Sequence, residues 1–370
     1  MSRVFHYSPA IPVRDAIGFS TRSLYSAMLS AGLETYLVCD QDSISSAPIF
    51  TLNVEQMLAL RPGSQDLIIF HHSFLDQNVD RILSLPCKKV IVYHNITPGH
   101  FFRDAGLGWL ADACDEGRQR LGSMSAMFDR VVGDSEFNVS ELEARGYPRG
   151  HVIPVFYDDL FFRRPFDDAE AELRSFNGSC INMAFIGRFV PNKRPDNLIR
   201  IAALVGKMSG RKTKLRLFGK LWDRTYFRTL WRLVEDLGLE DAVSFELNVP
   251  REGLKSALSS SDAFVSASEH EGFMVPLVEA FATGCPVVAL ASSAVVGTCG
   301  SAGLLVTEPD LEQMAARIVC IAENPDLKRS LMRVQAQRSE DFSSLKTLNK
   351  WNSLLGEFLP TSLVKHENRV

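Results

Sequence analysis

Two successive series of short β-rich runs, each followed by a helical pattern, limit the possible folds of this chain more than any other feature. The first series comprises RVFHYS (3–8), TYLVCD (35–40), DLIIFHHS (66–73), KKVIVYHN (88–95), RVVGDS (130–135) and HVIPV (151–155). Strands that alternate with helices form parallel sheets flanked by helices. The first part of the chain is therefore predicted to be a doubly wound α/β domain.

A second series repeats this organisation after residue 180. It comprises INMAFIG (181–187), KLRLFG (214–219), AVSFELN (242–248), DAFVSAS (262–268), PVVAL (286–290) and AGLLV (302–306), each followed by a helical segment. A chain of 370 residues exceeds the roughly 250 to 300 residues at which single cores stop growing. The prediction is an α/β protein with two doubly wound, Rossmann-like domains in tandem.

The boundary between the two series lies in a charged segment with little strand character. We place the interdomain linker around residues 156–180. The predicted domains are residues 1–165, which would bind an acceptor, and residues 166–343, which would bind a nucleotide. Residues 344–370 form a last helix and tail with no strand to follow, and we expect them to cross back onto the first domain.

Composition narrows the class of protein. The chain has 46% hydrophobic residues, 23% charged residues and a net charge of −4, as expected for a globular enzyme, and nothing suggests bulk nucleic-acid binding. No apolar run approaches the roughly 18 residues that a membrane helix needs, so we expect a cytoplasmic protein whose membrane contact, if any, is peripheral, at the inner face of the cell membrane. Seven scattered cysteines, none in a CxxC pair, predict reduced thiols.

The most informative loop is SEHEGF, between the run DAFVSAS and a helix. Pro276 suits the first turn of that helix, and Gly284 suits its end. Glu271 lies in the loop and Glu279 is expected in the first helical turn, so both would face a ligand at the helix N-terminus. Either carboxylate alone is more simply explained by solvation or by the helix dipole.

Backbone groups of the same loop are further candidates. Gly272 would allow a ligand to approach the main chain closely, and the N–H groups of Phe273 and Met274 could bind its oxygens. The sequence therefore predicts a binding site at the carboxyl edge of the second sheet.

A second strand-to-helix loop adds two cations to this edge. Arg188 and Lys193 follow the run INMAFIG, and the next helix is expected to begin near Pro195. Two fixed cations beside a helix N-terminus could stabilise the negative charge that develops on a departing diphosphate, without a metal. A basic pair in one loop is often only solvated, but the two loops together favour a diphosphate site.

Taken together, GRFVPNK (187–193), the E-x7-E segment EGFMVPLVE (271–279) and the following AFATGCPVV resemble the donor-binding residues of glycosyltransferase family 4. The resemblance covers essentially the whole second half of the chain. The first half is more loosely similar, through SEFNVSELEARGY (135–147) and HVIPV.

The resemblance implies a GT-B fold and a retaining transfer from a UDP- or GDP-sugar as co-substrate, with no separate cofactor. By position, Arg188 and Lys193 would bind the pyrophosphate, Glu271 the sugar hydroxyls and Glu279 the ribose. His94, at the end of the run KKVIVYHN, would contact the donor sugar near the reacting carbon. A partly buried structural histidine is the alternative for His94.

Acceptor contacts are expected from two loops of the first half. Asn95 and Thr97 follow His94. The loop PAIPVRDAIGFS resembles the glycine-rich acceptor loop of the family but has only Gly18 where two glycines are common. Its candidates are Arg14, Asp15 and Ser20 as well as Gly18.

The resemblance also implies the partners. The donor would carry a hexose, with mannose favoured, and the acceptor would be a glycan or a lipid-linked saccharide in the synthesis of a bacterial surface polysaccharide. Front-side attack would let the acceptor proton pass to the departing phosphate. The sequence leaves open a noncatalytic GT-B module that binds a glycan or a partner, and a GT-B sugar-nucleotide epimerase.

Two further features have simpler explanations. Asp40-Gln-Asp42 has the DxD form of a metal-binding motif, but a turn is the expected structure. The segment 211–232 mixes basic and aromatic residues and could contact an anionic membrane, but an amphipathic helix with an apolar core face and a solvated basic face is the expected structure.

Overall fold

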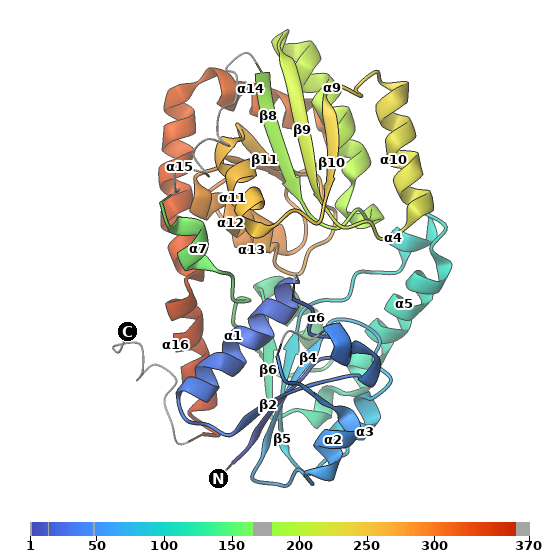
Figure 1. Ribbon diagram of the computed structural model, residues 1–370, viewed down its shortest axis with the longest axis vertical. Coiled ribbons are helices and arrows are strands. Elements are labelled where there is room, and N and C mark those ends of the chain that lie inside the picture. Colours follow the sequence, from blue (N-terminus) through green and yellow to red (C-terminus); the bar gives the residue numbers. More distant parts are fainter. Residues whose placement is uncertain (1, 14, 47–48, 166–179, 360–370) are drawn as a thin grey trace. The chain divides into compact units, whose positions relative to one another are not determined.

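The computed structural model describes residues 2–13, 15–46, 49–165 and 180–359, and these form two compact units (Figure 1). Unit 1 is drawn from the ranges Met1–Gly99, Trp109–Tyr157 and Phe342–Val370, and unit 2 from His100–Gly108 and Asp158–Asp341. The chain thus passes between the units after Tyr157, whereas the sequence placed this boundary after residue 165. Part of the expected linker, residues 166–179, lies outside the described residues.

Unit 1 is built on a parallel sheet. Its strand order is β3 (Leu52–Asn53), β2 (Thr35–Cys39), β1 (Val4–Tyr7), β4 (Leu67–His72), β5 (Lys88–Tyr93), β6 (Arg130–Gly133) and β7 (His151–Val152). Each β-rich run of the first series contains one of these strands. The two-residue β3 was not predicted.

Helices flank this sheet (Figure 1). They are α1 (Ala16–Ser30), α2 (Val54–Ala59), α3 (Val79–Leu83), α5 (Gly108–Ser123), α6 (Glu136–Glu143) and α16 (Ser344–Leu355), with short 3-10 turns at Gln41–Ser46 and Ser125–Met127. The core of unit 1 includes Leu348, Trp351 and Leu354 of α16, which pack with Val4 and Leu24. Helix α16 is therefore part of the unit that contains the N-terminus.

The pattern that follows the first β-rich run predicts a helix that begins after Gly18, but α1 already begins at Ala16. The helix begins at Ala16 because Asp15 caps it, accepting hydrogen bonds from the N–H groups of Ile17 and Gly18. A Cβ atom at Gly18 would lie 2.4 Å from the carbonyl oxygen of Pro12. Gly18 is therefore required by the close approach of the preceding loop, inside the first turn of the helix.

Unit 2 repeats the architecture with the order β10 (Val243–Leu247), β9 (Lys212–Gly219), β8 (Cys180–Ile186), β11 (Ala263–Ser266), β12 (Val287–Leu290) and β13 (Leu304–Val306), all parallel. Every run of the second series is one of these strands. In both sheets the chain starts at a central strand, adds strands on one side, and then reverses. Ligands of such sheets bind at this reversal, beyond the carboxyl ends of the strands.

The helices of unit 2 are α4 (His100–Arg103), α7 (Asp159–Arg163), α9 (Pro195–Ser209), α10 (Arg224–Asp236), α11 (Arg251–Ser260), α12 (Val275–Thr283), α13 (Ala294–Cys299), α14 (Leu311–Glu323) and α15 (Pro325–Ser339), with 3-10 turns η3 (Pro191–Lys193) and η4 (Glu340–Phe342). Within α10, Leu230 and Val234 are buried in the core. The basic, aromatic segment 211–232 thus includes an amphipathic helix. No helix in the described part of the chain is long and apolar enough to span a membrane.

All seven cysteines lie among the described residues, and all are free thiols. Most are buried, so they contribute to packing.

Candidate nucleotide-sugar site

The two loops singled out in the second half of the sequence meet at the reversal of the unit 2 sheet. One follows β8 and leads through η3 into α9, and the other follows β11 and leads into α12. Because β8 and β11 are neighbours, their carboxyl ends bring Arg188, Lys193 and Glu271 to one edge. The helices begin at Pro195 and Val275, and Gly284 ends α12 in a left-handed conformation, as the sequence predicted.

Lys193 and Glu271 are in direct contact. The Lys193 ammonium forms an ion pair with the Glu271 carboxylate, and the two side chains are 16% and 8% exposed. Burial lowers the pKa of Lys193, Glu271 opposes that shift, and nearby Arg188 adds to it. The loops therefore place one anion and two cations within electrostatic reach of one another.

Two hydrogen bonds to main-chain carbonyl oxygens hold the two loops together. The N–H group of Glu269 donates to the carbonyl oxygen of Asn192 at 2.8 Å, and the Asn192 side-chain amide donates to the carbonyl oxygen of His270 at 3.1 Å. Asn192 is buried. Asn192, next to Lys193, is thus bonded to the two residues that precede Glu271, and these bonds fix the position of the Lys193–Glu271 pair.

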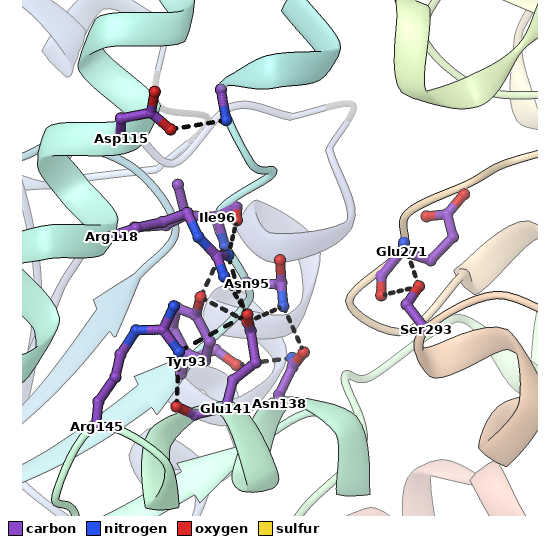
Figure 2. Close-up of polar contacts among 11 residues, drawn as sticks. Tyr93, Asn95, Ile96, Asp115, Arg118, Asn138, Glu141, Arg145, Glu271 and Ser293 are labelled. Atoms are coloured by element: carbon purple, nitrogen blue, oxygen red, sulfur yellow. Dashed lines mark hydrogen bonds and ion pairs between the residues drawn. The ribbon is translucent and has the colours of Figure 1, made fainter.

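Ser293, in the loop between β12 and α13, holds Glu271 from a third direction. The Glu271 N–H group donates to Ser293 Oγ at 2.7 Å, and Ser293 Oγ donates to the Glu271 carbonyl oxygen at 3.0 Å (Figure 2). Ser293 has φ 40° and ψ −123°, which is unfavourable for a residue with a side chain. The loop geometry is kept despite this local strain.

Strain recurs in the other two loops of this edge. Met274 has φ 77° and Arg194 has φ 49°, and each lies directly before a helix of unit 2. Non-glycine residues in the left-handed region cluster at functional sites, where the surrounding structure holds them. Phe273 and Met274 are both buried, and Phe273 accepts a hydrogen bond from Thr298 through its carbonyl oxygen, at 2.7 Å. Gly272 is half-buried beside them.

Arg188 is exposed, with its guanidinium 5.3 Å from the centre of the Trp222 ring. It forms no ion pair with any described residue. This cation is therefore available to an anionic ligand.

Glu279 lies beyond the first turn of α12, so the expectation that it falls in that turn is wrong: the helix begins at Val275, and no acidic residue lies in its first turn. Its side chain is half-buried and has no hydrogen-bond or ion-pair partner among the described residues. Burial raises the pKa of Glu279 to about 7, Arg251 opposes the shift, and Asp158 adds to it. A half-buried carboxylate without a partner is suited to accept hydrogen bonds from a ligand.

In unit 1, His94 is buried, and both of its ring nitrogens have protein partners. Nδ1 lies 2.8 Å from Asp134 Oδ2, and Nε2 lies 2.9 Å from His71 Nδ1. The His94 side chain is 1% exposed. In this arrangement the His94 ring therefore presents no free nitrogen to a ligand.

The loop after His94 is held by Glu141 of α6 (Figure 2). The Asn95 amide donates to Glu141 Oε2 at 2.7 Å and to Asn138 Oδ1 at 3.0 Å, while Asn95 itself has φ 74°. Arg118 pairs with Glu141 and donates to the Ile96 carbonyl oxygen at 2.5 Å. Thr97 follows, half-buried.

The glycine-poor loop of unit 1 uses its polar candidates internally. Asp15 caps α1, and Ser20 Oγ accepts a hydrogen bond from the Phe156 N–H group at 3.1 Å. Arg14 lies outside the described residues. In the DxD-like segment, Asp40 accepts hydrogen bonds from Tyr7 and Asn78, and Asp42 lies in the 3-10 turn Gln41–Ser46. The described side chains include no cluster of metal ligands.

Several residues that hold these loops were not found from the sequence: Ser293, Asn192, Asp134 and Glu141. Ser293 carries the clearest available signal, because it stands in a polar strand-to-helix loop at the same sheet edge as Glu271. The partners of the other three depend on tertiary contacts.

The two sheets define the class of the protein. Over 96% of this chain and all of the other, the fold matches that of Anabaena HepE, whose crystal structure contains UDP and glucose, with a TM-score of 0.76 and 16% sequence identity. The chain therefore has the GT-B fold, as the resemblance implied.

Sequence comparison gives the family. Residues 175–338 match the family model "Glycosyl transferases group 1". The D-inositol 3-phosphate glycosyltransferase of Mycolicibacterium smegmatis is 32% identical over 291 residues, which are 70% of this chain and 66% of that protein. The enzyme of the same name from Acidothermus cellulolyticus is 29% identical over 300 residues, which are 77% of this chain. The chain belongs to the group 1 glycosyltransferases, and it spans 65% of the length of the Acidothermus relative.

Proposed function

We propose that the chain is a retaining glycosyltransferase that transfers a hexose from a nucleoside-diphosphate sugar. The observation that carries this proposal is the convergence of Arg188, Lys193 and Glu271 at the reversal of the unit 2 sheet. Two cations match a diphosphate, and a fixed carboxylate matches sugar hydroxyls. Glu279, which is half-buried and has no side-chain partner among the residues that the structure describes, would accept hydrogen bonds from the ribose hydroxyls.

In the proposed reaction, the bond from the anomeric carbon to the diphosphate oxygen breaks while the acceptor oxygen attacks from the same face. The acceptor proton passes to the departing phosphate, so the anomeric configuration is retained. Arg188 and Lys193 stabilise the charge that develops on the nucleoside diphosphate. Because these cations neutralise the leaving group, we propose a reaction that needs no metal, and chelation should leave its rate unchanged.

The proposed acceptor is a glycan or a lipid-linked saccharide used in a bacterial surface polysaccharide, and mannose is the sugar to test first. A phosphorylated polyol is also to be tested, because the similar proteins named above are D-inositol 3-phosphate glycosyltransferases. Asn95 and Thr97 are the proposed acceptor contacts of unit 1. The proposed location is the cytoplasm, with peripheral contact at the inner face of the membrane.

Isothermal titration with GDP, UDP, GDP-mannose and UDP-glucose tests the proposal. One nucleotide is expected to bind at about micromolar strength, and Lys193→Met should weaken it at least roughly tenfold, the cost of one charge-assisted hydrogen bond. Lys207→Met is the matched control, since Lys207 is exposed in the last turn of α9. If no nucleotide binds, a noncatalytic GT-B module becomes the better account.

A further inference from the structure

Four polar side chains form a diagonal line on one face of the unit 1 sheet. In the strand register His6 pairs with Ile69, His71 pairs with Val92, and Val92 pairs with Val132. Side chains two residues apart on a strand share a face. His6, His71, His94 and Asp134 therefore step across β1, β4 and the ends of β5 and β6 on the same face.

Three members of this line form a hydrogen-bonded chain. His71 Nδ1 is 2.9 Å from His94 Nε2, and His94 Nδ1 is 2.8 Å from Asp134 Oδ2. The two imidazole planes differ by 2°. A single near-planar chain thus runs from β4 to the end of β6, and His94 is its middle member.

Burial explains why the His71 ring, at one end of this row of hydrogen-bonded side chains, is neutral. His6 and His71 are 0% and 2% exposed, and burial lowers the pKa of His6 to about 3 and that of His71 well below its usual value. The His6 ring stacks on that of His71, and neither the two His6 ring nitrogens nor His71 Nε2 has a hydrogen-bond partner among the described residues.

The hydrogen bonds that link His71, His94 and Asp134 restrict where the ring protons of the two histidines lie. Burial raises the pKa of Asp134, and His94 opposes that shift. With Asp134 ionised and the His94 ring neutral, Asp134 can only accept, so the proton between them resides on His94 Nδ1. His94 Nε2 then accepts from His71 Nδ1–H. Both rings thereby carry their proton on Nδ1, and neither can rotate without breaking a buried hydrogen bond.

The next residue makes this restriction matter for the proposed reaction. Asn95 follows His94 directly, has φ 74°, and begins the loop that leads through Thr97 to Gly99. Gly99 ends it against Asp115, whose carboxylate accepts the Gly99 N–H group at 2.9 Å. A ring fixed at the start of the loop sets the position from which Asn95 and Thr97 project.

We propose that His71 and Asp134 are positioning residues that act through His94: they hold its ring in one tautomer and one orientation, and thereby fix the start of the Asn95–Gly99 loop. For its activity readout the proposal rests on the transferase function proposed above. Neither residue needs to touch a substrate.

The test compares His71→Leu, which removes the hydrogen bond, with His71→Asn, whose amide can replace ring nitrogen Nδ1. His71→Leu is expected to lower kcat about tenfold or more, the cost of losing a buried hydrogen-bond partner. Its nucleotide affinity should be unchanged. His71→Asn should keep most of the kcat of the unsubstituted protein. His72→Leu is the matched control, because His72 points to the other face of β4, is 3% exposed and has no partner for its ring nitrogens in the described part of the chain. It should leave kcat near that of the unsubstituted protein.

Nitrogen NMR of the histidine rings gives a readout that needs no substrate. His94 should show one tautomer, protonated on Nδ1, and His71→Leu or Asp134→Asn should change that signal while His72→Leu does not. The proposal is overturned if His94 exchanges between tautomers in the unsubstituted protein, or if His71→Leu behaves like His72→Leu. Loss of nucleotide binding in the titration above would instead count against the transferase function alone.

Discussion

Lys193 and Glu271 form an ion pair although they come from loops that follow different strands, β8 and β11. In the proposed complex the Lys193 ammonium binds the diphosphate and Glu271 binds the sugar, so the two must partly separate when a ligand enters. Glu271 therefore competes with the nucleoside diphosphate for the Lys193 ammonium.

This competition predicts opposite effects of two substitutions. Glu271→Gln should bind GDP or UDP as tightly as the unsubstituted protein or up to about tenfold more tightly, because the charge on Lys193 is no longer neutralised. Lys193→Met should weaken the same nucleotides. Isothermal titration with nucleotides that lack the sugar checks this. A loss of nucleotide affinity in Glu271→Gln would show that Glu271 supports the diphosphate site and does not compete with it.

Nucleotide affinity should also depend on pH through Glu279. Burial raises the pKa of Glu279 to about 7, so the carboxylate, which accepts hydrogen bonds with both oxygens, forms as pH rises through that value. Affinity should increase roughly threefold to tenfold between about pH 6 and pH 8 and level off above. Titration at a series of pH values with a nucleoside-diphosphate sugar, whose esterified diphosphate has no proton to lose in this range, measures this.

Two variants make the assignment specific. Glu279→Gln should give a flat profile across the same range, because the amide does not titrate. Glu252→Gln, at an exposed position in the first turn of α11, should keep the full pH dependence. An unsubstituted protein with a flat profile contradicts the role of Glu279.

The fold was largely predictable because its strands are buried apolar runs that end in polar loops. INMAFIG and DAFVSAS mark β8 and β11 clearly, and Pro195, Pro276 and Gly284 mark helix ends through local backbone preferences. The start of α1 differs from the prediction because Gly18 lies inside the first turn of the helix and not before it. Its actual role, close contact with Pro12, depends on a tertiary approach that no local pattern encodes.

The donor-side candidates were predictable for the same reason. Charged residues just after neighbouring parallel strands must share one edge, so Arg188, Lys193 and Glu271 could be grouped from the sequence. That Lys193 and Glu271 pair directly, and that Ser293 supports Glu271, depends on strained loop conformations. For His94 the position was predictable, but its two buried partners were not, because they come from other strands.

Ser293 allows backbone strain to be separated from hydrogen bonding. Ser293→Ala removes both hydrogen bonds to Glu271 but keeps a Cβ atom at φ 40°, whereas Ser293→Gly removes the same bonds and relieves the strain. Ser293→Gly should therefore be more stable than Ser293→Ala by about 1 kcal/mol. Denaturant unfolding measures the difference. Equal stability of the two variants would mean that this conformation costs little.

Asp76 should make stability depend on pH. It is 3% exposed; its Oδ1 accepts from Tyr7 and from the Asn78 N–H group, and its Oδ2 has no partner among the described residues. Burial raises its pKa from 3.8 to about 6, so its contribution to stability is fully present below pH 3.8 and is lost as pH rises through about 6.

Asp76→Asn removes this titration while keeping an oxygen for Tyr7 and Asn78. The variant should gain up to about 3 kcal/mol relative to the unsubstituted protein at pH 8, and much less at pH 4. Thermal unfolding at both values checks this. Asp80→Asn, at a side chain 81% exposed, is the control and should show no such trend. A difference independent of pH would mean that Asp76 is not a buried titrating group.

The exposed face of α10 gives the last prediction, that unit 2 binds anionic membranes. Trp222 and Trp231 are 45% and 40% exposed, and Arg224, Arg228 and Arg232 are exposed at intervals of one helical turn, without an ion pair to a described residue. An arginine close to an anionic bilayer contributes about 1 kcal/mol, so replacing all three by Gln should weaken binding roughly 100-fold.

Co-sedimentation with phosphatidylcholine vesicles, with and without phosphatidylglycerol, measures this. Trp222→Ala with Trp231→Ala should weaken binding as well, whereas Trp109→Ala in α5, 66% exposed, should not. Equal binding to both kinds of vesicle, or none, would leave α10 as a solvated helix.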